Sequence, residues 1–272
     1  MIDSYDSESN IRIYDAQAHE GMGKAGKLAS EVLDYITPFV KTGVSTGELD
    51  KLMHEFILDN GAIPAPLGYN GFPKATCLSI NHVVCHGIPD FGRKLKSTDM
   101  LNIDTTVIVD GWYGDTSRMY FADEDKAPIK AKRLVQTTYE CLWRGIEQVK
   151  PGNTFGDIGH AIQEYAEGMG YGVVREFVGH GIGLKFHEAP NVMHFGKSGT
   201  GATLREGMMF TIEPMINGGK PDTKLLADGW TAVTRDKSLS AQAEHTLIVT
   251  ADGYKVFTES QIGLHQPPYN KK

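Results

Sequence analysis

The sequence lacks the cysteine pattern of a disulfide framework or of a structural zinc knuckle. Its three cysteines, Cys77, Cys85 and Cys141, are odd in number and contain no CxxC pair, which favours a reducing compartment. No apolar run approaches the length needed to cross a bilayer. The first residues, MIDSYDSESNIRIYD, have neither the basic nor the apolar region of a signal peptide. We therefore expect a soluble, cytoplasmic protein with no membrane segment.

The chain also lacks an excess of basic charge, since its formal net charge is −7. A general nucleic-acid-binding surface would be basic, so stable binding to nucleic acid is not expected. The 40% apolar content, 31 glycines and 12 prolines indicate a turn-rich globular protein. No feature of the sequence indicates a subunit interface, so a monomer is expected.

Two parts of the chain repeat each other at a constant offset of 109 residues. Residues 40–61 and 149–170 share a glycine turn, a Ser or Thr cap and an amphipathic helix that ends at glycine. The same offset relates residues 95–104 to 204–213, which places Asp104 on Glu213. Apolar residues recur at helical spacing from Asp15 to about Lys41, and again over 128–149. The repeat predicts two similar α/β halves that face one another.

Residues 101–118 have the pattern of a β-hairpin, with Asp110-Gly111 as a strong turn signal. Asp104 would pair with Arg118 or its neighbour, and Asp115 would lie diagonally opposite on the same face. The alternative is a pair of surface aspartates near a turn. A carboxylate inside an apolar strand is expensive without a partner, so a role in binding a ligand is favoured.

Carboxylates and one histidine, each in a short local context that suits metal chemistry, predict a dinuclear divalent-metal site of the hydrolytic kind. Each is weak evidence alone, but the five together are strong: Asp104, Asp115, His180, Glu213 and Glu244. His86 in CHGIPD and His187 in KFHEAP lie in turns that could project them into a cleft, where they suit contacts with a substrate. The other histidines, His194 among them, are expected to be structural or on the surface.

The ordered motifs GYNGFPKATCLSIN, VCHGIPD, NIDTTVIVDGWYGDTSRMY, GHGIG, FHEAP, FTIEPM and DGWTAVTRDKSLSAQAEHT resemble those of type I methionine aminopeptidases of the bacterial form, in the peptidase M24 family. The resemblance covers the chain from about Ile13 to Glu259 and implies the pita-bread α/β fold, a curved antiparallel sheet covered by helices. It implies a polar N-terminal tail over 1–12, one catalytic domain over 13–260 with pseudo-repeats at about 15–125 and 126–255, and a C-terminal tail over 261–272. The implied reaction removes the initiator methionine from nascent proteins when the second residue is small and uncharged.

The resemblance also implies a role for each candidate residue. The five ligands would hold two divalent ions, of Co²⁺, Mn²⁺, Fe²⁺ or Zn²⁺, with Asp115 and Glu244 bridging, and a water acidified by both ions would attack the scissile carbonyl. Glu213 would shuttle a proton, His187 would stabilise the carbonyl oxygen, and His86 would contact the substrate near the scissile nitrogen. The methionine pocket would be lined by Tyr69, Phe72, Cys77, Phe186 and Trp230. Asn81, Val83 and Ser240 match the positions of a Na⁺ or K⁺ site, which is a weaker carry-over.

The partners implied are the N-termini of nascent polypeptides, with transient contact to the ribosome. The sequence departs from the family at His82, where an acidic residue is expected, and in HEAP, which replaces the commoner HEEP. Neither position is a ligand in the family. Two alternatives rank lower: a proline dipeptidase or creatinase relative, which usually carries a large N-terminal domain, and a binding protein of the same fold that has lost its metals. Loss of a ligand would support the last alternative, and all five are present.

Overall fold

The computed structural model describes residues 4–269 of the chain. Its helices are α1 (Ala16–Ile36), α2 (Thr46–Asp59), α3 (Ile129–Ile146) and α4 (Phe155–Gly168), with short 3₁₀ helices at Thr37–Phe39, Tyr69–Gly71 and Glu124–Lys126. The first helix was predicted to continue to about Lys41 but ends at Ile36, because Pro38 cannot donate a helical hydrogen bond. Thr37, which keeps helical φ and ψ, begins the short 3₁₀ helix instead.

The strands fall into two groups along the chain. Those before α3 are β1 (Ser4–Tyr5), β2 (Arg12–Ile13), β3 (Ile63–Pro64), β4 (Cys77–Ile80), β5 (Val83–Cys85), β6 (Met100–Val109) and β7 (Trp112–Phe121). Those after α4 are β8 (Gly172–Val173), β9 (Gly179–Gly181), β10 (Glu188–Val192), β11 (Met209–Ile212), β12 (Met215–Asn217), β13 (Thr223–Leu225), β14 (Ala232–Thr234), β15 (Ser240–Gln242), β16 (His245–Val249) and β17 (Tyr254–Val256).

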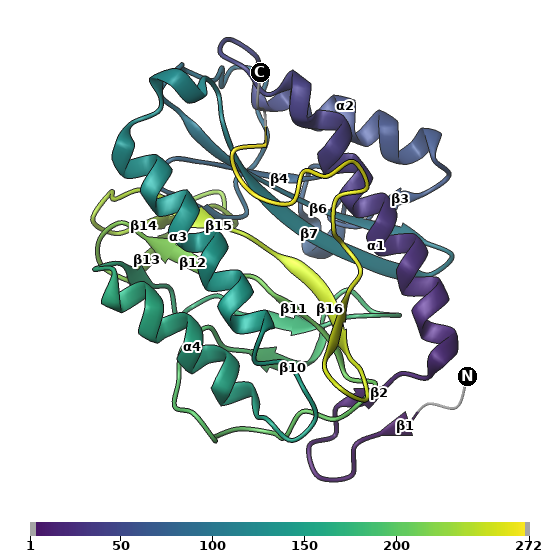
Figure 1. The fold of residues 1–272 in the computed structure, drawn as a ribbon. Coiled ribbons are helices and arrows are strands. Elements are labelled where there is room, and N and C mark those ends of the chain that lie inside the picture. The colour runs from purple at the N-terminus through teal and green to yellow at the C-terminus, as the bar shows by residue number, and fades with distance from the viewer. Residues whose placement is uncertain (1–3, 270–272) are drawn as a thin grey trace.

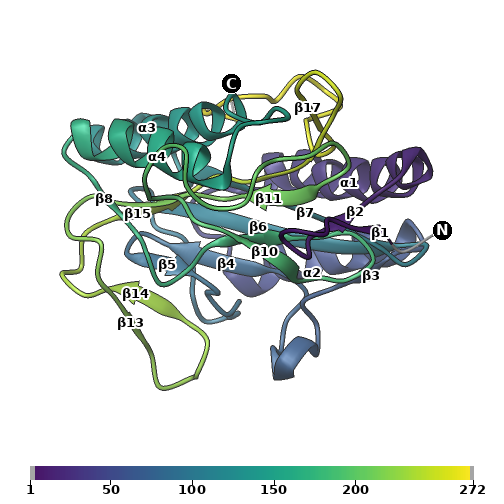
Figure 2. The ribbon, with the colours of Figure 1, turned by 90° about the horizontal axis from the view of Figure 1, so that it is seen from below.

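The two largest sheets are antiparallel and belong to opposite halves of the chain. The first pairs β3, β6 and β4, with β7 added to β6; the second has the order β10-β9-β11-β16-β17. Helices α1 and α3 lie side by side on one side of these strands, and the β13–β14 hairpin projects from the other (Figures 1 and 2). This is the mixed α/β arrangement that the sequence predicts.

The repeated segments adopt the same local structure in both halves. Helices α2 and α4 are each 14 residues long, and each begins with a capping box, formed by Ser45 with Glu48 and by Thr154 with Asp157. Ser45 bridges to Lys94 and Thr154 bridges to Thr203, so even these isolated pairs keep the offset of 109 residues. Each half also has its own apolar core, one between α1, α2 and β6 and the other between α3, α4 and β11.

The halves meet along a seam between β7 and the segment that joins β15 to β16. Thr116 Oγ1 donates to the carbonyl oxygen of Glu244 at 2.8 Å, and Thr246 Oγ1 donates to that of Asp115 at 2.7 Å. The Glu244 N–H donates to Ser117 at 3.2 Å. All these groups are buried, so the seam holds Asp115 from one half beside Glu244 from the other.

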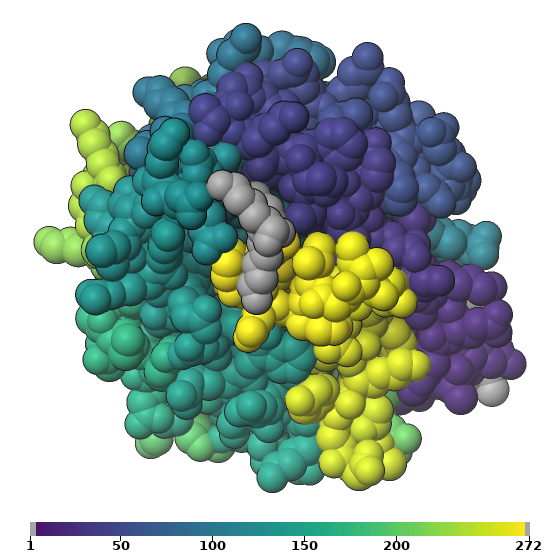
Figure 3. Space-filling model, turned by 45° about the horizontal axis from the view of Figure 1, so that its top comes forward, coloured from purple at the N-terminus to yellow at the C-terminus, as the bar shows by residue number. Residues whose placement is uncertain are grey.

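The C-terminal segment, yellow in Figure 3, lies between the part of the surface that contains α1, in purple, and the part that contains α3, in teal. Ser260 Oγ and the Gln261 N–H donate to the carboxylate of Asp34 on α1, and the same carboxylate pairs with Arg118 Nη1 on β7 at 2.6 Å. The ring of Tyr269 lies 5.3 Å from the Arg118 guanidinium and is buried. A buried ion pair needs such added hydrogen bonds to offset desolvation, so residues 260–269 complete the interior.

Within residues 4–269, no helix is long and apolar enough to cross a membrane.

We predict that Gly114→Ala destabilises the protein. A Cβ at Gly114 would lie 2.3 Å from the main chain of Ala25 on α1, so helix and strand would have to separate. The expected cost is about 1–3 kcal/mol in the free energy of unfolding, measured by urea denaturation.

The matched control is Gly23→Ala on α1, where a Cβ would meet no atom within 4 Å. This change should stabilise the protein by about 0.5–1 kcal/mol, because alanine favours the helix over glycine. Equal stability of the two variants would show that α1 does not pack directly on β7.

Candidate metal centre and active-site cleft

The hairpin from β6 to β7 places the two aspartates as the sequence predicts. Asp110 and Gly111 both have positive φ, at 50° and 84°, which suits a two-residue hairpin turn. Asp104 pairs with Ser117, the neighbour of Arg118, and Asp115 pairs with Thr106. The two carboxylates are therefore diagonal neighbours on one face of the hairpin.

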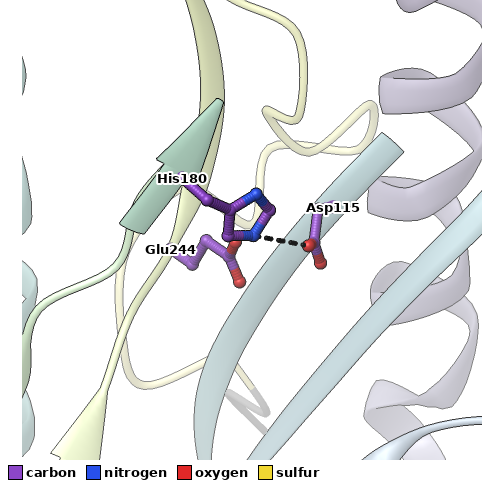
Figure 4. A group of neighbouring side chains, drawn as sticks. All are labelled: Asp115, His180 and Glu244. Atoms are coloured by element: carbon purple, nitrogen blue, oxygen red, sulfur yellow. Dashed lines mark ion pairs between the residues drawn. The ribbon is translucent and has the colours of Figure 1, made fainter. Parts of the chain in front are cut away.

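The second half brings a histidine and two glutamates to the same place. His180 lies on β9, Glu213 directly follows β11, and Glu244 lies between β15 and β16. The Nε2 atom of His180 is 3.6 Å from Asp115 Oδ2 and 3.6 Å from Glu213 Oε1. Ligand atoms of Asp115, His180 and Glu244 lie within 4.8 Å of one another, with their side chains turned toward a common point (Figure 4).

The five predicted ligands all line one cavity of about 730 Å³. Neighbouring side chains fix the orientation of several of them: Thr106 Oγ1 donates to Asp115 at 2.8 Å, and Thr211 Oγ1 donates to Glu213 at 2.8 Å. The main-chain N–H of His180 donates to the same Thr211 hydroxyl at 3.0 Å. The hydroxyls of Thr106 and Thr211 thus help to hold three of the candidate ligands in place.

Burial and mutual repulsion disfavour the charged forms of these acids. Burial, followed by the charge of Asp115, raises the pKa of both Asp104 and Glu244 well above the ordinary values. Burial also raises the pKa of Glu213, to about 7. Burial alone would lower the pKa of His180, but its hydrogen bond to Asp115 and the charge of Glu213 outweigh that effect and raise it.

The donor set fits divalent cations. One oxygen of Glu244, Oε1, is buried and has no hydrogen-bond partner among residues 4–269. A buried carboxylate without a partner is costly, and the other acids nearby cannot supply one while they are ionised. Four carboxylates with one imidazole are the hard oxygen and nitrogen donors that such cations take.

His86 and His187 line the same cavity. His86 has a φ of 56°, a conformation that non-glycine residues hold at a cost and that is concentrated at functional sites. His187 is exposed to the cavity, yet desolvation by the surrounding walls and the charge of His180 lower its pKa to about 4. Both imidazoles are therefore neutral near pH 7, since burial lowers the pKa of His86 as well.

The predicted methionine-pocket residues also border the cavity: Tyr69, Phe72, Cys77, Phe186 and Trp230. Phe72 and Trp230 form an edge-on pair at 5.2 Å, and Trp230 lies 6.2 Å from the ring of His86. Burial raises the pKa of the Cys77 thiol well above its ordinary value, so it presents a neutral, soft surface. The wall as a whole suits an apolar, polarisable side chain.

Two residues that the sequence did not single out contact Glu213. His194, expected to be structural or on the surface, is fully buried, and its Nε2 accepts the main-chain N–H of Glu213 at 3.1 Å. Gln242 Nε2 donates to Glu213 Oε2 at 3.1 Å. No local pattern marks His194, which lies in a loop between β10 and β11. For Gln242, its place two residues before Glu244 is the feature of the sequence that could have indicated a role beside the ligands.

The predicted monovalent-cation residues are adjacent, because the Ser240 N–H donates to the carbonyl oxygen of Asn81 at 2.8 Å. Val83 follows on β5, which pairs with β14. The hydroxyl of Ser240 is buried without a hydrogen-bond partner among the described residues. A role for this group of residues stays a prediction.

Fold and site together define a metal-dependent hydrolase of the pita-bread class, and residues 20–251 match the model of metallopeptidase family M24, to which the chain belongs. It is 57% identical over 260 residues to the methionine aminopeptidase of Rickettsia prowazekii, covering 95% of this chain and 99% of that relative. A crystal structure of methionine aminopeptidase from the same organism superposes with a TM-score of 0.89 and covers 91% of this chain and 99% of that one. The prolidase of Pyrococcus horikoshii shares the fold at 21% identity and a TM-score of 0.71, with 92% of this chain and 64% of that one covered.

We predict that the acid cluster destabilises the metal-free protein as the pH rises. The folded state holds protons on Glu213 and its neighbours more tightly than the unfolded chain, in which a glutamate has a pKa of about 4.3, so their contribution is lost between that value and the folded pKa of Glu213, about 7. Buried histidines such as His187 and His194, whose pKa burial lowers to about 4 and about 3, act in the opposite direction over the same range. The effect of the cluster is therefore measured by comparing the melting temperature of stripped wild-type protein with that of a variant that lacks one acid, between pH 5.5 and pH 7.5, and Mn²⁺ should raise the wild-type value at pH 7.5.

Glu244→Gln is the matched control, because it keeps the side-chain shape and removes one ionisable group from the cluster. Between pH 5.5 and pH 7.5 its metal-free melting temperature should fall less, or rise more, than that of the wild type, and the gain from Mn²⁺ should be smaller. The same change with pH in both proteins would contradict the electrostatic account.

Proposed function

We propose that this chain is a methionine aminopeptidase that releases the initiator methionine from nascent polypeptides. The observation that carries the proposal is the convergence of five metal-ligand residues with an aromatic pocket in one cavity. A relative named methionine aminopeptidase, which matches 95% of the chain at 57% identity, supports it. The preference for a small, uncharged second residue is part of the proposal.

The residues that would hold two divalent cations are Asp104, Asp115, His180, Glu213 and Glu244. When bound, such ions polarise a carbonyl group and lower the pKa of water, which is the chemistry that peptide hydrolysis requires. The donor set admits manganese, iron(II), cobalt or zinc, and affinity order alone does not choose among them.

The histidines and Glu213 would handle the proton and the developing charge. Glu213, whose oxygens are oriented by Thr211 and Gln242, would accept a proton from water and return one to the leaving amine. His187 is neutral near pH 7, so its imidazole N–H would donate to the carbonyl oxygen as negative charge builds up there. His86, which lines the same cavity, would contact the substrate near the scissile nitrogen.

The aromatic wall would supply specificity for methionine. A thioether packs well against aromatic faces, and Phe72, Phe186 and Trp230 provide them beside the neutral thiol of Cys77. Binding of the side chain in this pocket would leave the next residue close to the ligand cluster. Little room there would exclude a large second residue.

The function is tested by methionine release from Met-Ala-Ser by metal-stripped protein, before and after addition of Mn²⁺ or Co²⁺. Release should depend on the metal, and Met-Leu-Ser measured alongside should be cleaved at least about a hundredfold more slowly, the discrimination that exclusion from a shaped pocket supplies. A folded protein that releases no methionine with any of these metals would instead support a binding protein of the same fold.

A further inference from the structure

The hydroxyl of Tyr14 contacts the segment that joins β9 to β10 and also the first residue of β10. It donates to Glu188 Oε1 at 2.5 Å and accepts the main-chain N–H of Leu184 at 3.3 Å. Tyr14 lies between β2 and α1, 174 residues from Glu188 in the sequence. One buried oxygen from the N-terminal region therefore bridges a segment of the second half.

The surrounding chain leaves space for this hydroxyl and no more. A Cβ at Gly183 would lie 2.0 Å from the Tyr14 hydroxyl oxygen, so only glycine fits there. The Tyr14 N–H donates to the carbonyl oxygen of Gly207 at 2.8 Å, and its ring packs on Trp112 at 5.6 Å. Tyr14 is thus fixed by its main chain and its ring, and its hydroxyl is a rigid point.

Glu188 is held as an acceptor at this point. Its side chain is only 11% exposed, and Arg12 Nη1 lies 3.9 Å from its second oxygen. Arg12 also stacks over the Tyr14 ring at 5.5 Å. A carboxylate buried this far needs charge and hydrogen-bond partners, and the contacts with Tyr14 and Arg12 supply them.

The bridged segment carries His187, the residue directly before Glu188. His187 Nδ1 is 2.9 Å from the Tyr69 hydroxyl, and its ring centroid is 4.2 Å from that of His180. Its neighbour Phe186 stacks on Tyr113 at 5.7 Å, and Glu188 pairs with Gly181 in the ladder of β10 and β9. The residue next to His187 is therefore held twice, by its main chain in the sheet and by its side chain at Tyr14 and Arg12.

We propose that Tyr14, with Arg12, is a positioning residue that acts through Glu188 to hold the imidazole of His187 in the cleft. The proposal rests on the proposed function, because it assigns the N-terminal segment a part in that reaction. A displacement of a catalytic group by about 1 Å costs up to about a hundredfold in rate. The Tyr14 hydroxyl would therefore affect turnover without touching the substrate.

The test compares Tyr14→Phe with wild type in two measurements. In metal-free protein labelled with ¹⁵N-histidine, the imidazole signals of His187, assigned with His187→Gln, should shift or broaden. In Mn²⁺-loaded protein, kcat for Met-Ala-Ser should fall about tenfold while KM changes less than twofold, because a positioning loss of this kind falls mainly on the reacting step.

Tyr120→Phe is the matched control, since it removes another buried hydroxyl, one that donates to Leu33 at 3.0 Å on the far side of β7 from the cleft. It should lower the melting temperature comparably and leave kcat and the His187 signals unchanged. Glu188→Gln tests the contact from the other side. A neutral acceptor keeps the hydrogen bond, so most of the turnover should remain, whereas Glu188→Ala should reproduce the loss seen in Tyr14→Phe.

The double variant Tyr14→Phe/Glu188→Ala should be no slower than Glu188→Ala alone if both act through one contact. Multiplied losses, or a Tyr14→Phe protein with wild-type kcat and unchanged His187 signals, would overturn the proposal. A wild-type protein that releases no methionine would reject the proposed function instead, and the metal-free signals of His187 would still decide whether Tyr14 positions it.

Discussion

The structure depends on the burial of four carboxylates beside one histidine at the seam between two halves. Burial first, and then the charge of Asp115, raise the pKa values of Asp104, Glu213 and Glu244. No single half could hold such a cluster, because each contributes only part of it. Bound cations would attract these acids and so offset the repulsion between them. The rest of the fold holds the acids close together in the metal-free protein.

The protein offsets that cost with fixed polar groups around the seam. Threonine hydroxyls orient two of the acids, and His194 Nε2 accepts the main-chain N–H of Glu213. Hydrogen bonds from the hydroxyls of Thr116 and Thr246 to the carbonyl oxygens of Glu244 and Asp115 join the hairpin to the facing strand. The candidate ligands line a cavity whose walls also carry the aromatic side chains and the two neutral histidines.

Much of this could be predicted from the sequence because it is local or repeated. The Asp110-Gly111 turn sets the register that makes Asp104 and Asp115 diagonal neighbours, and the offset of 109 residues is kept by both capping boxes. Contacts between distant loops have no such pattern. Neither the burial of His194 nor the bond from Tyr14 to Glu188 leaves a signal in spacing, since each depends on how separate segments meet in space.

The central claim is that both halves share two cations, and the most direct test is a crystal structure of Mn²⁺-loaded protein with anomalous scattering measured at the manganese edge. The account predicts two manganese peaks in the cavity, with Asp115 from the first half and Glu244 from the second both in contact with manganese. A single peak bound only by residues of one half, or no peak in the cavity, would contradict it.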